Sequence, residues 1–220
     1  ENLHHLGIAT TLVEMAPQVM GMFDYEMAQI IHQHIVDQGA GLILNDGVKA
    51  FSDEGKSIEL ASGFKLKSDL TILAIGVRPD NTLAKQADLT LTKRGSIEVD
   101  EHFLTSDKNI YAIGDVIDVK QSVTGDILSV ALAGPANKQA RYVADHICGE
   151  EATYVGTIAT SAAKVFEKDV ASVGVNEKTL REKGLPFKAI HLHPSSHASY
   201  YPGASPISMK VLFDPETERI

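Results

Sequence analysis

An aspartate follows a glycine at the end of an apolar stretch in the segment TSDKNIYAIGDV, residues 105–116. Residues 110–113 favour a buried strand, because aromatic and β-branched side chains suit a pleated surface. Gly114 would let a ligand approach the backbone closely. Asp115 would then stand at the carboxyl edge of a sheet, where α/β folds bind ligands, and its carboxylate could accept hydrogen bonds from sugar-alcohol hydroxyl groups. The alternative for Asp115 is an Asx turn or a helix cap.

A second acid, Glu14, ends the predicted strand 8–15. In a dinucleotide-binding βαβ unit, an acid at this place accepts hydrogen bonds from a ribose diol and repels the extra phosphate of NADP. The glycine fingerprint that should precede it, G-x-G-x-x-G, is not in the sequence. Gly39 and Gly41 stand between a helix and a strand, which is the wrong context. The alternative, which Glu14 taken alone favours, is a solvated strand end.

The predicted helix 134–149 opens with Gly134 and Pro135. Free N–H groups and the positive end of the helix dipole could face an anionic or electron-rich group there, and plain helix initiation is the alternative.

Cys148, the single cysteine, lies at the other end of this helix, about 20 Å away at 1.5 Å per residue. The negative dipole end disfavours a thiolate, so we expect Cys148 to be a packed structural thiol.

Metal binding and serine chemistry find little support in the sequence. His191 and His193 could share one face of a strand, with His197 nearby, but no cysteine or clear acid accompanies them. We therefore expect no metal site. The sequence also contains no G-x-S-x-G motif, which argues against a nucleophilic serine of the hydrolase type.

Local patterns predict the helices and strands that would carry these side chains. A helix spans residues 23–39, with Asp24 as its N-cap, Gly39 at its end, and an apolar face of Met27, Ile30, Ile31 and Ile35. A strand at 41–45 follows, and then a meander that ends in an apolar strand, 70–75. The remaining predicted elements are a short helix (81–89), strands within 95–115, the helix 134–149, and strands at 162–175 and 187–194 around a helix at 176–184.

Composition limits the classes of function. The chain has 220 residues and a net charge of −9, and its basic residues do not cluster, which argues against nucleic-acid binding. No stretch approaches the roughly 18 apolar residues of a membrane span, and no signal peptide is visible. A single cysteine excludes an internal disulfide framework, so we expect a cytoplasmic protein. The segment ENLHHLG begins as though already inside a helix, and we expect the chain to be a fragment of a longer protein.

Six motifs in order resemble one known family. They are LVEMAPQVM, AIGVRPD, TSDKNIYAIGDV, LAGPANKQAR, KVFEKDVASVGVNEK and SHASYYPGA. Together they resemble the FAD-dependent pyridine nucleotide-disulfide oxidoreductases over essentially the whole chain. Within that family the sequence is most similar to the branch of coenzyme A-disulfide reductases, persulfide reductases, and NADH oxidases and peroxidases, and SHASYYPGA points to the first two.

The resemblance implies roles for the residues already singled out at the flavin site. Asp115 would hold the ribityl chain of FAD, with Gly114 allowing the cofactor to approach. The helix opening at Gly134–Asn137 would point its N-terminus at the flavin pyrimidine ring, and Ala133, Gly134 and Pro135 would bind the cofactor. Helix N–H dipoles there would stabilise the negative charge of reduced flavin.

The resemblance also implies contacts with the other ligands. Glu14 would bind the adenosine ribose of NADH, and Gly76 would border the nicotinamide nucleotide. Tyr200 matches a tyrosine that reaches the thiol site of the partner subunit, and it is the one catalytic residue expected in this chain. Asn137 falls where some members place a polar residue near coenzyme A. The redox cysteine and both glycine fingerprints of the family have no counterpart in this sequence.

The implied fold is α/β, with three parts. These are an incomplete Rossmann-type NAD(P)-binding domain (1–78), the C-terminal half of an FAD-binding domain (79–152) and a partial α+β dimerisation domain (153–220). The parent would be a homodimeric flavoprotein that passes electrons from NAD(P)H through FAD to a thiol that reduces a coenzyme A disulfide or persulfide. The alternatives are an NADH oxidase or peroxidase acting on oxygen or peroxide, or a non-catalytic fragment or dimerisation module. By itself the chain is expected to be inactive and colourless.

Overall fold

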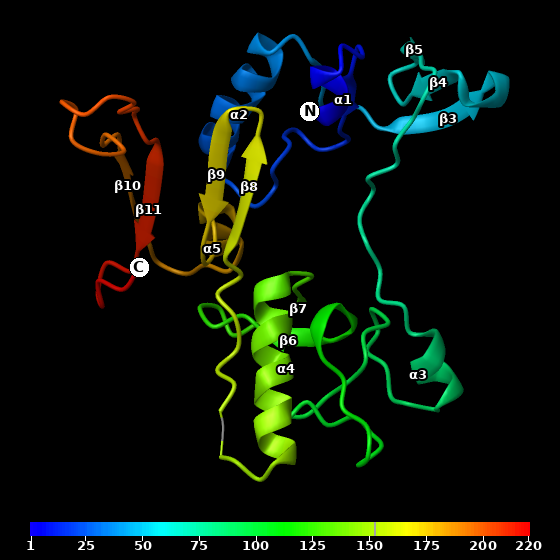
Figure 1. The fold of residues 1–220 in the computed structure, drawn as a ribbon, viewed down its shortest axis with the longest axis vertical. Coiled ribbons are helices and arrows are strands. Elements are labelled where there is room, and N and C mark those ends of the chain that lie inside the picture. Colours follow the sequence, from blue (N-terminus) through cyan, green and yellow to red (C-terminus); the bar gives the residue numbers. More distant parts are fainter. Residues whose placement is uncertain (152) are drawn as a thin grey trace. The chain divides into compact units, whose positions relative to one another are not determined.

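The computed structural model describes residues 1–151 and 153–220 (Figure 1). The chain forms two compact units. Unit 1 comprises residues 1–72, 163–170 and 175–220, and unit 2 comprises residues 73–162 and 171–174. Unit 1 is therefore built from both ends of the chain. Among the described residues, no helix combines the length and the apolar character that a membrane span requires.

Unit 1 contains a βαβ arrangement. Strand β1 (Thr11–Val13) pairs in parallel with β2 (Gly41–Ile43), and helix α2 (Tyr25–Asp37) connects them. Parallel neighbours need such a crossover, and the predicted order of strand, helix and strand is confirmed. Both strands are shorter than the predicted 8–15 and 41–45. A one-turn helix, α1 (Asn2–His5), precedes them.

Helix α2 buries a different face from the one predicted. Ile31 and Ile35 are buried as expected, but Ile30 is exposed. Ala28 and the polar His32 complete the buried face instead. Ile31 and Ile35 pack against Phe166, which lies in the turn between β8 (Ser161–Val165) and β9 (Lys168–Ser172). This contact joins segments more than a hundred residues apart into one core.

The predicted meander is present, but its last strand is not. Strands β3 (Val48–Ser52), β4 (Ser57–Leu60) and β5 (Lys65–Lys67) form an antiparallel sheet in the order β3-β4-β5, with a short 3-10 turn, η1 (Asp53–Gly55), between the first two. Residues 70–75, predicted as a buried strand, form no strand and are exposed, Ile75 to 88%. An apolar strand becomes buried only when neighbours pair with it and cover it, and no described strand does so here.

The C-terminal part of unit 1 contains a helix and a long hairpin. Helix α5 (Glu177–Glu182) begins at Asn176, whose side chain caps the backbone N–H of Thr179. Strand β10 (Lys188–Leu192) pairs antiparallel with β11 (Met209–Phe213). Helix α5 confirms the predicted helix at 176–184, and β10 confirms the predicted strand at 187–194. The strand predicted at 162–175 is instead divided by a turn into β8 and β9.

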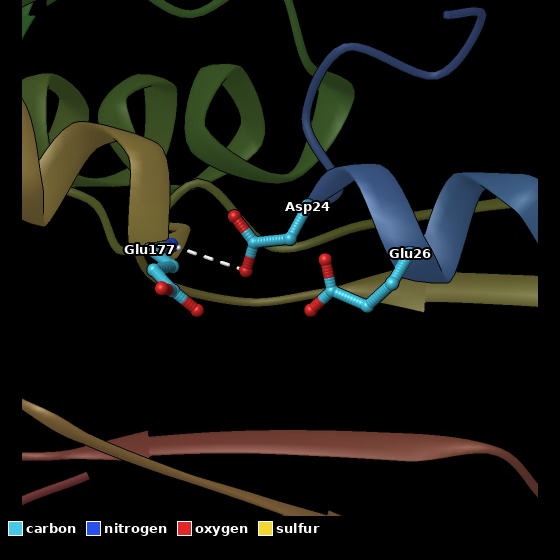
Figure 2. Close-up of side chains that lie close together, drawn as sticks. All are labelled: Asp24, Glu26 and Glu177. Carbon is cyan, nitrogen blue, oxygen red and sulfur yellow. Dashed lines mark hydrogen bonds between the residues drawn. The ribbon is translucent and has the colours of Figure 1, made fainter.

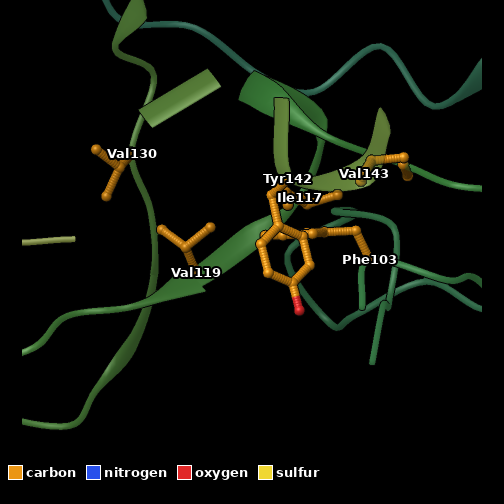
Figure 3. Close-up of a cluster of buried hydrophobic side chains, with 7 residues drawn as sticks. Phe103, Ile117, Val119, Val130, Tyr142 and Val143 are labelled. Atoms are coloured by element: carbon orange, nitrogen blue, oxygen red, sulfur yellow. The ribbon is translucent and has the colours of Figure 1, made fainter. Parts of the chain in front are cut away.

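Helix α4 (Ala133–Ile147) is the longest described element of unit 2, and the 3-10 turn η2 (Gly114–Val116) packs against it. The others are α3 (Thr82–Gln86) and the antiparallel pair β6 (Asp118–Lys120) and β7 (Ile127–Ser129). The core, shown in Figure 3, consists of Phe103, Ala112, Ile117, Val119, Val130, Tyr142 and Val143. The strand predicted at 110–113 is reduced to an isolated bridge between Leu104 and Tyr111, and the other strands expected within 95–115 are likewise single bridges.

Helix α4 agrees with the prediction at its end and differs at its start. Gly149 follows the last turn with a left-handed φ of +82°, as a helix stop requires. The helix begins at Ala133, so Pro135 occupies its third position and not its first. Cys148 is exposed at the C-cap, so the prediction of a packed thiol is wrong. Cys148 comes directly after Ile147, the last helical residue, which is itself exposed.

Candidate functional site

The turn that carries Asp115 packs against the first part of α4. Gly114 has a left-handed φ of +75°, and a Cβ built on it would lie 3.6 Å from the Cβ of Ala136. The left-handed backbone conformation therefore favours glycine at this position, whereas a Cβ would make only an ordinary van der Waals contact with the helix. Asp115 is exposed, and its carboxylate has no hydrogen-bond or ion-pair partner within residues 1–151 and 153–220. Its oxygens are free to accept hydrogen bonds from a ligand.

Gln139, which sequence reasoning did not identify, fixes this turn. Its side chain is 1% exposed, and its Oε1 accepts a hydrogen bond of 2.7 Å from the backbone N–H of Gly114. Its Nε2 donates to the hydroxyl of Tyr154 at 3.3 Å. Both ends of the amide are therefore satisfied. The only sequence signal was a polar residue on the helix face that carries Tyr142 and Val143.

The start of α4 offers backbone donors next to this turn. Its N-cap is Leu132, which has no side-chain hydrogen bond to the helix. The first N–H groups, of Ala133 and Gly134, have no acceptor inside a helix, and both residues are exposed. A Cβ on Gly134 would meet nothing within 4 Å. Free donors, a positive dipole end and a free carboxylate fit a ligand that has hydroxyl groups and an electron-rich ring. Asn137, one turn along, is exposed and its Nδ2 donates to the carbonyl of Ala133 at 2.9 Å.

In unit 1, Glu14 directly follows β1 and is partly buried. Its Oε1 accepts a hydrogen bond of 2.8 Å from the N–H of Ala16. Its own N–H donates to the carbonyl of Ile43 at 2.8 Å, which continues the parallel pairing of β1 and β2. The carboxylate thus stands at the carboxyl edge of this pair with one oxygen fixed, where α/β proteins bind ligands.

The two other predicted site residues lie in exposed segments. Gly76, with a left-handed φ of +100°, follows the unpaired stretch 70–75. Tyr200 is 82% exposed in the loop between β10 and β11, and its ring centre lies 4.9 Å from that of Tyr201. The base of this loop is closed by a hydrogen bond from the N–H of Ser196 to the carbonyl of Ser205 at 2.8 Å. Gly114, Asp115 and the start of α4 are the predicted site residues that the structure brings together.

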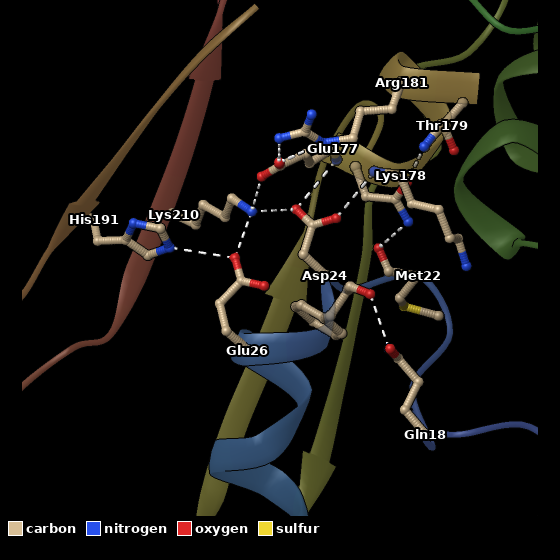
Figure 4. A network of polar contacts seen from close by, with 12 residues as sticks. Gln18, Met22, Asp24, Glu26, Glu177, Lys178, Thr179, Arg181, His191 and Lys210 are labelled. Carbon is tan, nitrogen blue, oxygen red and sulfur yellow. Dashed lines mark hydrogen bonds and ion pairs between the residues drawn. The ribbon is translucent and has the colours of Figure 1, made fainter. Parts of the chain in front are cut away.

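An ion-pair network in unit 1 was not predicted from the sequence. Lys210 of β11, whose side chain is 6% exposed, places its Nζ 2.9 Å from Asp24, 2.5 Å from Glu26 and 2.6 Å from Glu177 (Figure 4). Asp24 occupies the N-cap position of α2 without capping it through its side chain. Its carboxylate instead accepts hydrogen bonds from the N–H groups of Glu177, at 3.1 Å, and Lys178, at 3.3 Å.

The electrostatics of this network favour its charged form. Hydrogen bonds from Lys210 lower the pKa of Glu26 and of Glu177 below the usual glutamate range. Burial of Lys210 acts against its charge, but its bonds to the carboxylates raise the pKa of its ammonium group overall. The carboxylates of Asp24, Glu26 and Glu177 lie close enough together to hold a metal ion (Figure 2). The ammonium of Lys210 bonds to all of them, so the cluster already contains its cation.

Comparison with known proteins identifies the family. The protein-family model described as pyridine nucleotide-disulphide oxidoreductase matches residues 1–140. The model described as the dimerisation domain of pyridine nucleotide-disulphide oxidoreductases matches residues 160–220. The chain therefore belongs to the pyridine nucleotide-disulphide oxidoreductase family, and the predicted resemblance and α/β fold class are confirmed.

Three similar proteins belong to the coenzyme A disulfide reductases and persulfide reductases by their names. Coenzyme A disulfide reductase of Staphylococcus aureus (strain JH9) is 30% identical over 221 residues, which cover 100% of this chain and 50% of the relative. The crystal structure of reduced Bacillus anthracis CoADR-RHD has 48% identity and a TM-score of 0.94, covering 97% of this chain and 38% of that one. An NAD-dependent persulfide reductase from A. fulgidus has 33% identity and a TM-score of 0.93, covering 98% and 40%. The chain spans about half the length of the curated relative it matches.

Proposed function

We propose that this chain is part of a flavoprotein that passes electrons from NAD(P)H through FAD to a cysteine thiol, which reduces a coenzyme A disulfide or a persulfide. The family uses FAD and NAD(P)H. The names of the similar proteins, a coenzyme A disulfide reductase and a persulfide reductase, support the sulfur substrates. The single observation in this chain that carries the proposal is the free carboxylate of Asp115 beside the uncapped start of α4.

In this proposal, the residues of unit 2 hold the flavin. FAD supplies the two-electron chemistry that connects a hydride donor to a thiol. Asp115 would accept hydrogen bonds from the hydroxyl groups of the ribityl chain, and Gly114 would let that chain approach. The N–H groups of Ala133 and Gly134, with Pro135 fixing the first turn, would stabilise negative charge on the pyrimidine ring. Asn137 would lie near the coenzyme A moiety.

The nicotinamide cofactor would be bound by residues on either side of the meander. Glu14 would accept hydrogen bonds from the adenosine ribose, and its charge would repel the 2′-phosphate of NADPH, which favours NADH. Gly76 would border the nicotinamide nucleotide. The division into domains at residues 1–78, 79–152 and 153–220 is part of the same proposal.

The thiol chemistry would need a second subunit. Residues 160–220 match a dimerisation domain, and we propose a homodimer in which the exposed Tyr200 reaches the thiol site of the partner. Its hydroxyl would donate a hydrogen bond to the sulfur that carries charge after the substrate bond breaks. The protein would act in the cytoplasm, where thiols stay reduced.

Steady-state assays of the whole protein with NADH test this proposal. Coenzyme A disulfide and coenzyme A persulfide are compared with oxygen and hydrogen peroxide as electron acceptors. We expect a kcat/KM for one of the coenzyme A substrates at least about a hundredfold above that for oxygen or peroxide, a difference of about 2.7 kcal/mol in transition-state binding. A preference for oxygen or peroxide would assign the protein to the oxidase and peroxidase branch and reject the proposal.

A further inference from the structure

His32 is a buried polar residue in the middle of α2 that no ligand contact above explains. Its side chain is 6% exposed, and its Nε2 lies 3.1 Å from the backbone nitrogen of Val19. A backbone N–H is a donor, so Nε2 must be the unprotonated nitrogen that accepts this hydrogen bond. Burial lowers the pKa of His32, which favours this neutral form.

We define residues 14–23, between β1 and α2, as the Glu14 loop. The hydrogen bond to His32 anchors the part of this loop around Val19, its far side from Glu14. Its near side is tied to the residues after β2, because the N–H of Asn45 donates to the carbonyl of Ala16 at 3.0 Å. Its far side packs Val19 and Met20 against the core of α2, and there the hydrogen bond of Val19 to His32 fixes the backbone.

The path of this loop determines where the carboxylate of Glu14 points. The N–H of Ala16 holds one oxygen of Glu14 at 2.8 Å, so the orientation of that N–H sets the orientation of the carboxylate. We infer that His32 is a positioning residue, which holds the Glu14 loop through Val19 and thereby sets the affinity for NADH and the discrimination against NADPH. This inference rests on the proposed function, in which Glu14 binds the adenosine ribose.

Two substitutions at His32 separate positioning from simple filling of space. His32→Leu removes the acceptor and keeps the apolar volume, whereas His32→Gln places an amide oxygen near the position of Nε2 and keeps the acceptor. His34→Gln, two residues along the same helix, is the matched control, because His34 makes no hydrogen bond to the Glu14 loop among the described residues. All three are made in the whole protein.

We expect His32→Leu to raise the KM for NADH about fivefold to tenfold, in line with the loss of one partly buried hydrogen bond. The ratio of kcat/KM for NADPH to that for NADH should rise, while kcat at saturating NADH and the KM for the sulfur substrate stay unchanged. His32→Gln and His34→Gln should lie within about twofold of the wild type. Hydrogen exchange at the amide of Val19 should accelerate in His32→Leu and not in His32→Gln.

The inference is overturned if His32→Leu leaves both the KM for NADH and the exchange of the Val19 amide unchanged. It is also overturned if kcat and kcat/KM for both substrates fall in parallel with the melting temperature, because a merely structural role would lower all of these values together. Glu14→Leu, measured alongside, removes the acceptor and tests the proposed function separately. An unchanged KM for NADH in Glu14→Leu, with a raised KM in His32→Leu, would reject the ribose contact and retain the loop anchor.

Discussion

Replacement of Gln139 by leucine tests the link between the Asp115 turn and helix α4. Gln139→Leu keeps a side chain of similar volume on the buried face of α4 but removes the oxygen that accepts from the N–H of Gly114 at 2.7 Å. The turn then has an N–H group that faces an apolar side chain. Because Asp115 follows Gly114 directly, any loosening of this turn changes where the carboxylate lies.

The size of the effect follows from the burial of the bond. Leaving a buried donor without a partner costs about 1–3 kcal/mol, and Gln139 is 1% exposed, so we take about 2 kcal/mol for the turn. If FAD binds only when the turn is formed, the apparent dissociation constant equals the intrinsic one divided by the fraction of molecules in which the turn is formed. Since about 1.4 kcal/mol corresponds to tenfold, the dissociation constant of FAD should rise about tenfold to thirtyfold.

The assay is the dissociation constant of FAD for the whole protein, measured by flavin fluorescence after removal and titration of the cofactor. Tyr154→Phe is the matched control, because it removes the hydroxyl that accepts from Gln139 and leaves the bond to Gly114 intact. We expect this control to bind FAD within about threefold of the wild type. An unchanged FAD affinity in Gln139→Leu would refute the reasoning, as would an equal loss in both variants.

Three further predictions concern other parts of the molecule. Asp115→Asn removes the charge that assists the bonds to the ribityl hydroxyls, so the dissociation constant of FAD should rise about tenfold or more; unchanged flavin content after dialysis would exclude the contact. Tyr200→Phe should slow oxidation of the reduced flavin by the sulfur substrate in stopped-flow experiments and leave its reduction by NADH unchanged, whereas equal slowing of both would exclude the assignment. Lys210→Met leaves Asp24, Glu26 and Glu177 without their shared cation, so the free energy of unfolding should fall by roughly 3 kcal/mol in denaturant titrations at pH 7, less than for a wholly buried pair because Glu26 is half exposed. The pKa of Glu177 is lower in the folded than in the unfolded protein, so this stabilisation is complete above about pH 4.5 and lost as the pH falls through the folded value; a Lys210→Met protein as acid-sensitive as the wild type would contradict it.

Local signals in the sequence predicted the helices and the meander of β3, β4 and β5 well, but not the β6–β7 and β8–β9 hairpins. Helix α2 begins after Asp24 and ends before Gly39, and α4 ends before Gly149, because capping positions and apolar spacing act within one or two turns. The meander of β3, β4 and β5 was predicted for the same reason, since tight turns fix the pairing of adjacent strands. The boundaries differ by a few residues, as expected where helix ends and strand ends lack specific caps.

The predictions of strands at 70–75 and 110–113 were wrong because the pairing of a strand depends on partners that are distant in the sequence. Their composition is that of buried strands, but composition does not state which strand lies alongside. The Lys210 network was missed for a related reason. Lys210 and Glu26 lie 184 residues apart, and no local pattern connects them. In the sequence alone, charged residues on short elements look like those of an ordinary solvated surface, because only the fold brings Lys210 and its partners together.

Gln139 and His32 were missed although each lies inside a correctly predicted helix. Both are polar residues on a buried face, and each accepts a hydrogen bond from the backbone N–H of a loop in which a ligand-binding acid is proposed. A carboxylate could accept the same bonds, but it would place a second negative charge beside Gly114, the neighbour of Asp115, or beside Val19 in the Glu14 loop. Like charges in a partly buried site raise the pKa of one acid and weaken its bonds to hydroxyl groups. A neutral amide or a neutral imidazole satisfies the N–H group and leaves the charge of the acid unchanged, which explains why residues of this kind occupy both positions.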